Sequence, residues 1–69
     1  MGEFNMQLQQ DELLTVDEIA GILKVPVSWI YERTRRRGIE RLPHVKLGKY
    51  LRFRMPEIQK WLEQQYREI

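Results

Sequence analysis

A proline between two helical patterns most constrains how this chain can fold. On both sides of Pro26, apolar residues recur at the i, i+3, i+4, i+7 spacing of one helix face. Proline disfavours the helical conformation of the residue before it, here Val25, but it is well tolerated in the first turn of a helix. The pattern therefore predicts one helix from about Val16 to Lys24 and a second from Pro26 to Arg37, joined by a very short turn.

Capping signals mark the expected ends of these two helices. Thr15 and Glu18 have the spacing of a capping box, in which each side chain satisfies a backbone N–H of the first turn. Leu14 and Ile19 occupy the positions of a hydrophobic staple, which packs across the same helix start. Gly38 is expected to end the second helix, because glycine readily adopts the left-handed conformation that follows many helices.

Residues 44–54 alternate between apolar and polar types around a glycine-containing turn, which predicts a β-hairpin. Cross-strand partners share a face of a hairpin, so the register can be predicted from the side chains. Pairing Leu47 with Leu51 places the apolar residues of both strands together and leaves residues 48–50 as a three-residue loop. A two-residue loop would instead oppose Lys46 to Leu51 and mix the two faces.

The predicted register makes the second face of the hairpin basic. Lys46 lies opposite Arg52 in this register, and His44 lies opposite Arg54. Like charges placed opposite each other destabilise an isolated hairpin. We therefore interpret this row of bases as a surface that phosphate groups neutralise, with solubilising edge-strand charges as the alternative.

A third helix completes the expected fold. It is predicted to begin at Pro56, and its apolar stripe includes Ile58, Trp61 and Leu62. Three helices and a two-stranded hairpin make a small α+β domain that is mainly helical.

The length of 69 residues permits one small domain, which we place at residues 13–69. Residues 6–12 are expected to form an N-terminal arm, and residues 1–5 resemble a cloning remnant ahead of a second methionine. The chain has no cysteine, and His44 cannot assemble a metal site alone, so we expect no metal and no cofactor. Because it has no long apolar run and no secretory signal, we expect a cytoplasmic protein without a membrane partner.

Charge is segregated along the chain, although the net charge is only +2. Residues 1–23 contain five acidic residues and no basic one, whereas residues 24–54 contain ten basic residues and two acidic ones. Such a basic middle segment is typical of a chain that binds a polyanion, and a solvated basic face is the alternative.

The second helix carries part of this basic surface. On a wheel at about 100° per residue, the side away from its apolar face carries Trp29, Glu32, Arg33 and Arg36. Tyr31 is expected in the core with its hydroxyl at the surface. A helix that follows another after a tight turn and presents such a face is typical of a helix-turn-helix reader in the DNA major groove. Trp29 is equally consistent with packing, and Glu32 is consistent with a cytosine contact or an ion pair with Arg36.

These arguments give two sets of candidate DNA contacts. The second helix contributes Ser28, Trp29, Glu32, Arg33, Arg36 and Arg37, and the hairpin contributes Lys46, Lys49, Tyr50, Arg52 and Arg54.

From Leu13 to about Glu63 the chain resembles the excisionase-type helix-turn-helix family, which is related to the MerR-like winged helix. Residues 14–25 resemble the first helix of that family, and Ser28-Trp29-Ile30-Tyr31 resembles its recognition helix. Leu47-Gly48-Lys49-Tyr50-Leu51-Arg52-Phe53 resembles the wing, and Ile58-Gln59-Lys60-Trp61-Leu62 resembles the closing helix.

The resemblance implies a winged helix-turn-helix that lays its second helix in the major groove and its wing on the adjacent backbone or minor groove. Members act as excisionases, which bend DNA for an integrase in recombination, or as small regulators of transcription. Two residues depart from the family pattern and alter the turn between the helices: Lys24 replaces a frequent glycine, and Pro26 replaces a frequent capping serine.

Double-stranded DNA is the expected partner, and the protein is expected to associate with the nucleoid and to have no enzymatic activity. A single module contacts little DNA, so cooperative self-association on repeated sites, or an integrase or other protein partner, is also expected. Two alternatives remain: an RNA or single-strand binding module that stacks bases on Trp29 and Tyr50, and a protein-interaction domain that docks an integrase-like partner.

Overall fold

The computed structural model describes residues 12–66. The predicted cloning remnant at residues 1–5, all but the last residue of the predicted arm at residues 6–12, and the predicted domain end at residues 67–69 lie outside this range. The elements are β1 (Leu13–Leu14), α2 (Val16–Leu23), α3 (Val27–Thr34), the 3-10 turn η1 (Gly38–Glu40), β2 (Val45–Leu47), β3 (Tyr50–Arg54) and α4 (Met55–Gln65).

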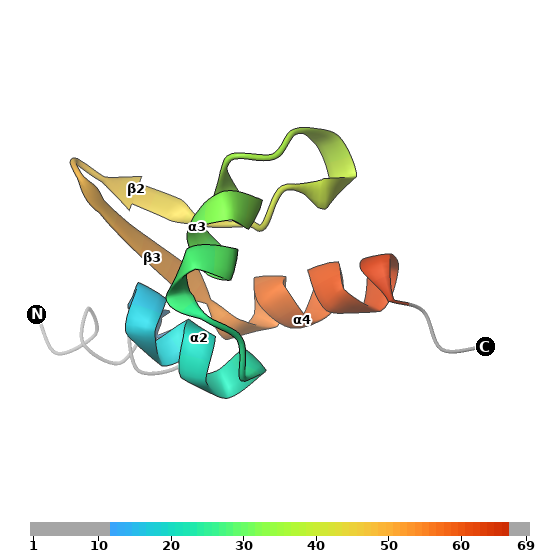
Figure 1. The fold of residues 1–69 in the computed structure, drawn as a ribbon, viewed down its shortest axis with the longest axis horizontal. Coiled ribbons are helices and arrows are strands. Elements are labelled where there is room, and N and C mark those ends of the chain that lie inside the picture. The colour runs from blue at the N-terminus through green and yellow to red at the C-terminus, as the bar shows by residue number, and fades with distance from the viewer. Residues whose placement is uncertain (1–11, 67–69) are drawn as a thin grey trace, which may run out of the picture.

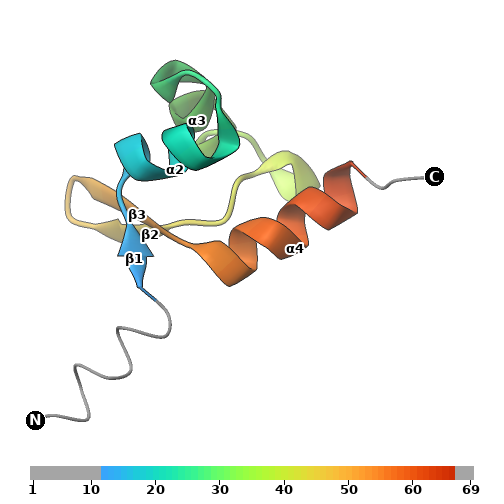
Figure 2. The ribbon, with the colours of Figure 1, turned by 90° about the horizontal axis from the view of Figure 1, so that it is seen from below.

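The arrangement confirms the predicted class, with three helices and an antiparallel hairpin. The hairpin of β2 and β3, which we call the wing, projects from one side of the molecule, and α4 extends toward the other (Figures 1 and 2). Helices α2 and α3 pack against each other, and β3 contacts both α2 and α4 (Figure 2). The central strand thus joins every layer of the fold.

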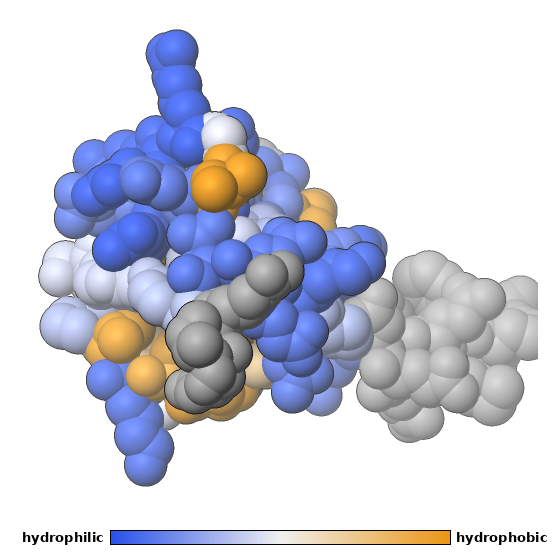
Figure 3. All heavy atoms as spheres, turned by 90° about the vertical axis from the view of Figure 1, so that its right-hand side faces the viewer, coloured by the Kyte–Doolittle hydropathy of each residue, from blue (hydrophilic) through white to orange (hydrophobic). Residues whose placement is uncertain are grey.

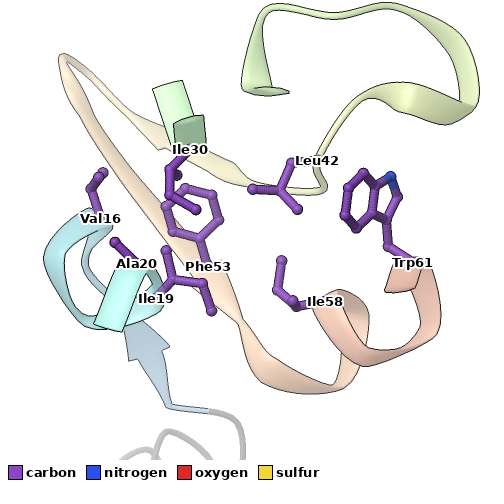
Figure 4. Packing of buried hydrophobic residues seen from close by; sticks show 8 residues of the cluster. All are labelled: Val16, Ile19, Ala20, Ile30, Leu42, Phe53, Ile58 and Trp61. Carbon is purple, nitrogen blue, oxygen red and sulfur yellow. The ribbon is translucent and has the colours of Figure 1, made fainter. Parts of the chain in front are cut away.

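The core is centred on Phe53 of β3, which is fully buried. Its ring lies among side chains from α2, α3 and α4 (Figure 4). The buried apolar set is Val16, Ile19, Ala20, Ile30, Leu42, Phe53, Ile58 and Trp61. Full burial of one large apolar side chain contributes about 1.5–3 kcal/mol, so these few residues hold the small domain together.

Helix α2 begins as predicted. The backbone N–H of Glu18 donates to Thr15 Oγ1 at 3.1 Å, and the backbone N–H of Thr15 donates to Glu18 Oε1 at 2.9 Å, which completes the capping box. The helix ends at Leu23, and the next residue, Lys24, adopts the left-handed conformation with φ 60°. A Cβ costs about 1–2 kcal/mol in that conformation, so the lysine strains the turn in which the related family often has glycine.

The predicted end of the second helix is wrong, because α3 ends at Thr34 and not at Arg37. Backbone N–H groups of Arg35 and Arg36 donate three residues back, to Glu32 and Arg33, which tightens the last turn. The carbonyl oxygen of Arg33 also accepts a bond from the N–H of Leu42, at 3.1 Å. The connector thus occupies the carbonyl that a further helical turn would use.

Gly38 does not cap α3, because it begins η1 instead, with φ 66°. The carbonyl oxygen of Ile39 in this turn accepts hydrogen bonds from Trp61 Nε1 at 2.9 Å and from Gln65 Nε2 at 2.5 Å. These bonds fix η1 to α4, although the Ile39 side chain is 78% exposed. On this end of the molecule, apolar atoms interrupt a mostly hydrophilic surface in its upper part and at its lower left (Figure 3).

The predicted register of the wing is also wrong. Leu47 pairs with Tyr50, Lys46 with Leu51 and Val45 with Arg52, so the turn contains two residues and not three. Gly48 explains this turn, because its φ of 61° at the first central position is what a tight two-residue hairpin requires. The wing tip projects away from the core, so no buried face compels the apolar residues of β2 to align with those of β3.

Two further details differ from the sequence analysis. Strand β1 pairs with β3 through Leu13 opposite Arg54 and Leu14 opposite Phe53, which adds a third strand to the predicted two. Helix α4 begins at Met55, one residue before Pro56.

Candidate nucleic-acid interface

A groove between α3 and the wing brings the basic residues of both elements together. It has a volume of about 320 Å³, and its lining residues are Tyr31, Thr34, Arg35, Arg41, His44, Lys46, Lys49 and Leu51. Four of these residues are Lys or Arg, and none is Asp or Glu. Four cations around one opening repel one another, so the groove favours an anionic ligand.

Each cation reaches the groove from a different part of the backbone. Arg35 caps α3 one turn after Tyr31 and therefore lies on the same flank of the helix. Arg41 follows η1, whose position is fixed by α4. The two-residue turn pairs Lys46 with Leu51, so these two side chains share one face of the wing. That face lines the groove.

Tyr31 and His44 line the groove beside these cations. Tyr31 is 42% exposed and lines the groove, so it is more exposed than a core residue with only its hydroxyl at the surface. His44 precedes β2, with Nδ1 2.8 Å from the carbonyl oxygen of Leu42 and its ring 6.4 Å from that of Phe53.

The other flank of α3 faces α4. The Trp29 ring packs edge-to-face on Trp61, with centroids 6.4 Å apart. The Arg33 guanidinium lies over the Trp29 ring, with Cζ 4.7 Å from its centroid, within the range of a cation–π interaction. Two residues predicted from the sequence as DNA contacts thus stack on each other, on the flank away from the wing.

Arg36, which lies just beyond the end of α3, links α3 to η1. Its Nη2 donates to Glu32 Oε2 at 3.1 Å, which confirms the predicted ion pair, and its Nη1 donates to Glu40 Oε1 at 2.9 Å. The hydrogen bonds to Glu32 and Glu40, and the attraction of both carboxylates, raise the pKa of Arg36 above its ordinary value. Arg36 and Arg37 both lie outside the helix in which the sequence placed them.

The remaining predicted residues lie at two other places. At the wing tip, Tyr50 is 55% exposed, and its ring centroid lies 5.7 Å from Lys49 Nζ and 5.5 Å from Arg52 Cζ. Arg54 lies at the start of α4, where Nη1 is 3.3 Å from Glu57 Oε2. Ser28 is exposed on α3.

Arg35 and Arg41 line the groove but are not among the candidate DNA contacts of the sequence analysis. The four-residue spacing from Tyr31 to Arg35 could have placed Arg35 on one flank, but nothing showed which flank faces the wing. Arg41 lies in an irregular connector, whose path depends on the hydrogen bonds of Ile39 to α4.

Within residues 12–66, no three His, Cys, Asp or Glu side chains form a group that could hold a metal ion. None of the helices in that range is long and apolar enough to cross a membrane.

Comparison with known families agrees with this geometry. A family model described as a helix-turn-helix domain matches residues 13–66, which include every helix and strand described above. Comparisons with curated proteins and with solved structures gave no significant match. Helices α2 and α3 are the pair joined by the tight turn, and the match covers most of the chain. The chain therefore belongs to the helix-turn-helix domain family.

Proposed function

We propose that this protein binds double-stranded DNA sequence-specifically and without catalysis, as an excisionase or a small regulator of transcription. In this proposal α3 enters the major groove, and the wing lies on the adjacent backbone or minor groove. Its site of action is then the DNA of the cytoplasm.

The groove between α3 and the wing is the observation that supports this proposal. Arg35, Arg41, Lys46 and Lys49 surround it from two sides, with no acidic residue in its lining. A phosphate backbone passing through the groove would be contacted from both sides, which fixes the register of a protein on a duplex. The exposed surface of α3 would then face the adjoining base edges.

The contacts suggest different roles for the residues predicted from the sequence. We assign Lys46, Lys49, Tyr50 and Arg52 to the backbone contact of the wing. Ser28 and Glu32 face the bases, and Arg37 follows α3 toward the backbone. Trp29, Arg33 and Arg54 support the fold, because their side chains engage Trp61, Trp29 and Glu57.

Cooperative binding follows from the size of the domain. One module of this size buries roughly 600–1,000 Å² on DNA, which is little for specific recognition. We therefore propose that copies bind side by side on repeated sites, or that an integrase or other DNA-bound protein adds contacts.

A salt titration of duplex binding tests the proposal. If each of the four groove cations neutralises one phosphate, the logarithm of the association constant falls with the logarithm of salt concentration with a slope of about −3.6. The protein is titrated into a fluorescently labelled duplex pool, and binding is followed by fluorescence anisotropy. The same titration with single-stranded DNA and with RNA of the same length compares the affinities for the three nucleic acids. A slope near zero, or tighter binding to single strands, would contradict the duplex proposal.

The single-strand alternative predicts stacking of bases on exposed rings. Trp29 packs on Trp61, so within the described residues Tyr50 is the candidate ring that remains at the tip of the wing. Replacing Tyr50 with Leu should then weaken single-strand binding strongly, whereas duplex binding should change by a factor of about two.

A further inference from the structure

We infer that Glu32 is a specificity-determining residue that reads cytosine in the major groove, and that Arg36 positions its carboxylate. The inference rests on the proposed duplex binding and adds the base that is selected. It explains an acidic side chain that the basic interface does not otherwise require.

Glu32 lies at the centre of the exposed side of α3. The buried residues of this helix are Ile30 and Thr34, and a rotation of about 100° per residue places Glu32 nearly opposite them. Its side chain is 62% exposed. It is the one acidic residue of α3, and it would face the DNA bases if α3 entered the major groove.

An acidic side chain at this place repels phosphates, so it weakens binding to every sequence unless a base offers it a hydrogen bond. Cytosine presents only a donor in the major groove, its N4 amino group. Guanine and thymine present only acceptors there, and adenine places its N7 acceptor beside its N6 donor. A carboxylate therefore favours cytosine over the other three bases.

Arg36 holds the carboxylate in a defined position. Its Nη2 binds Glu32 Oε2 at 3.1 Å, and its Nη1 binds Glu40 Oε1 at 2.9 Å, on the turn that α4 fixes. Among the described residues, Oε1 of Glu32 has no hydrogen-bond partner, so this oxygen remains available to a base. The positive charge of Arg36 also offsets the repulsion between the carboxylate and the phosphates.

Holding the carboxylate before binding reduces the entropy that is lost when it meets a base. An unrestrained glutamate side chain must give up several rotamers on binding, and a restrained one gives up fewer. Loss of Arg36 should therefore weaken the discrimination between bases, even though Arg36 itself contacts no base in this arrangement.

Selection of bound duplexes from a random pool, followed by sequencing, tests the inference. The wild type should enrich a motif with cytosine at one strongly selected position. Glu32→Gln should change the preference at that position from cytosine to adenine, by roughly tenfold, because the amide pairs with adenine N6 and N7. The other positions of the motif should remain as they are, which a merely structural role of Glu32 would not predict.

Variants of the two partners separate positioning from folding. Arg36→Met should reduce the cytosine preference several-fold, and Arg36→Lys should restore part of it. Glu40→Gln is the matched control, since it removes a negative charge beside Arg36, but the amide oxygen still accepts the hydrogen bond from Nη1 and the bond to Glu32 is untouched. The cytosine preference should therefore be kept. Circular dichroism of each variant verifies the fold.

The outcomes distinguish this inference from the proposal on which it depends. If the wild type enriches no motif, sequence-specific binding is wrong and the inference fails with it. If the wild type enriches a motif that Glu32→Gln leaves unchanged, duplex recognition stands and the inference alone is overturned.

Discussion

Arg33 and Arg35 lie two residues apart in the sequence but face opposite flanks of α3. Two residues correspond to a rotation of about 200°, which turns one side chain toward α4 and the other toward the wing. Arg33 stacks on Trp29, which itself packs on Trp61. Arg35 joins three other cations around an open groove.

The difference between the flanks shows that two arginines at the end of one short helix can have opposite electrostatic surroundings. A guanidinium over an aromatic ring is stabilised by the fold itself. A guanidinium among like charges is destabilised in the free protein and is stabilised when an anion enters. The first arrangement suits a structural contact, and the second suits a contact with phosphate.

The largest expected effect is on the α4 flank. Trp61 is 4% exposed and supports both Trp29 and η1, so Trp61→Ala should destabilise the domain by about 3–5 kcal/mol. Trp61→Phe keeps a ring but removes the hydrogen bond to Ile39, at a cost of about 1 kcal/mol. Urea denaturation followed by circular dichroism measures the stability of both variants. If the two variants lose the same free energy of unfolding, the hydrogen bond to Ile39 matters and the packing of the Trp61 ring does not.

On the wing flank, the largest effect should be on binding. Replacing both Arg35 and Arg41 with Gln should weaken duplex binding roughly 50-fold at about 0.1 M salt. The slope of the logarithm of the association constant against the logarithm of salt concentration should become shallower by about 1.8. Stability should be unchanged or slightly higher, because two like charges leave the groove. Lys60→Gln, an exposed change on α4, is the control for net charge. If this control weakens binding as much per charge as the double variant, the groove has no special role.

The parts of the fold that could be predicted from the sequence are those set by nearby residues. The capping box of Thr15 and Glu18 needs contacts only three residues apart, and both of its hydrogen bonds form. Side-chain alternation predicts the wrong register for the wing, because the turn conformation of Gly48 sets the pairing instead. The wing tip does not pack on the core, so aligning the apolar side chains of the two strands would bury little surface. Leu47 remains 47% exposed.

The candidate site was predicted as a combination of elements but not residue by residue. A basic helix and a basic wing follow from the charge pattern, and the structure places cations of both around one groove. The end of α3 could not be predicted, because it depends on a bond from Leu42 to Arg33 across the connector. That end decides that Arg36 meets Glu40 and that Arg41 reaches the groove.

A substitution in the turn before α3 should have a smaller effect on stability and should leave both flanks of α3 unchanged. Lys24→Gly removes a side chain from a residue with φ 60° and should stabilise the domain by about 0.5–1 kcal/mol, after the entropy cost of glycine. For a domain of this size the gain corresponds to about 2–8 °C in melting temperature. Lys24→Ala removes the same charge but keeps Cβ, so it should bring no such gain, and an equal gain would show that charge is responsible.

The smallest expected effect compares the two flanks most directly. Arg33→Gln removes the cation from the Trp29 ring and should destabilise the domain by about 0.5–1 kcal/mol. Its duplex affinity should stay within about twofold of the wild type, whereas Arg35→Gln alone should lose roughly eightfold at about 0.1 M salt. Arg33→Lys keeps a cation near the ring and should recover part of the stability. If Arg33→Gln lowers duplex affinity as much as Arg35→Gln does, the stack on Trp29 opens when DNA binds, and the two flanks act as one surface.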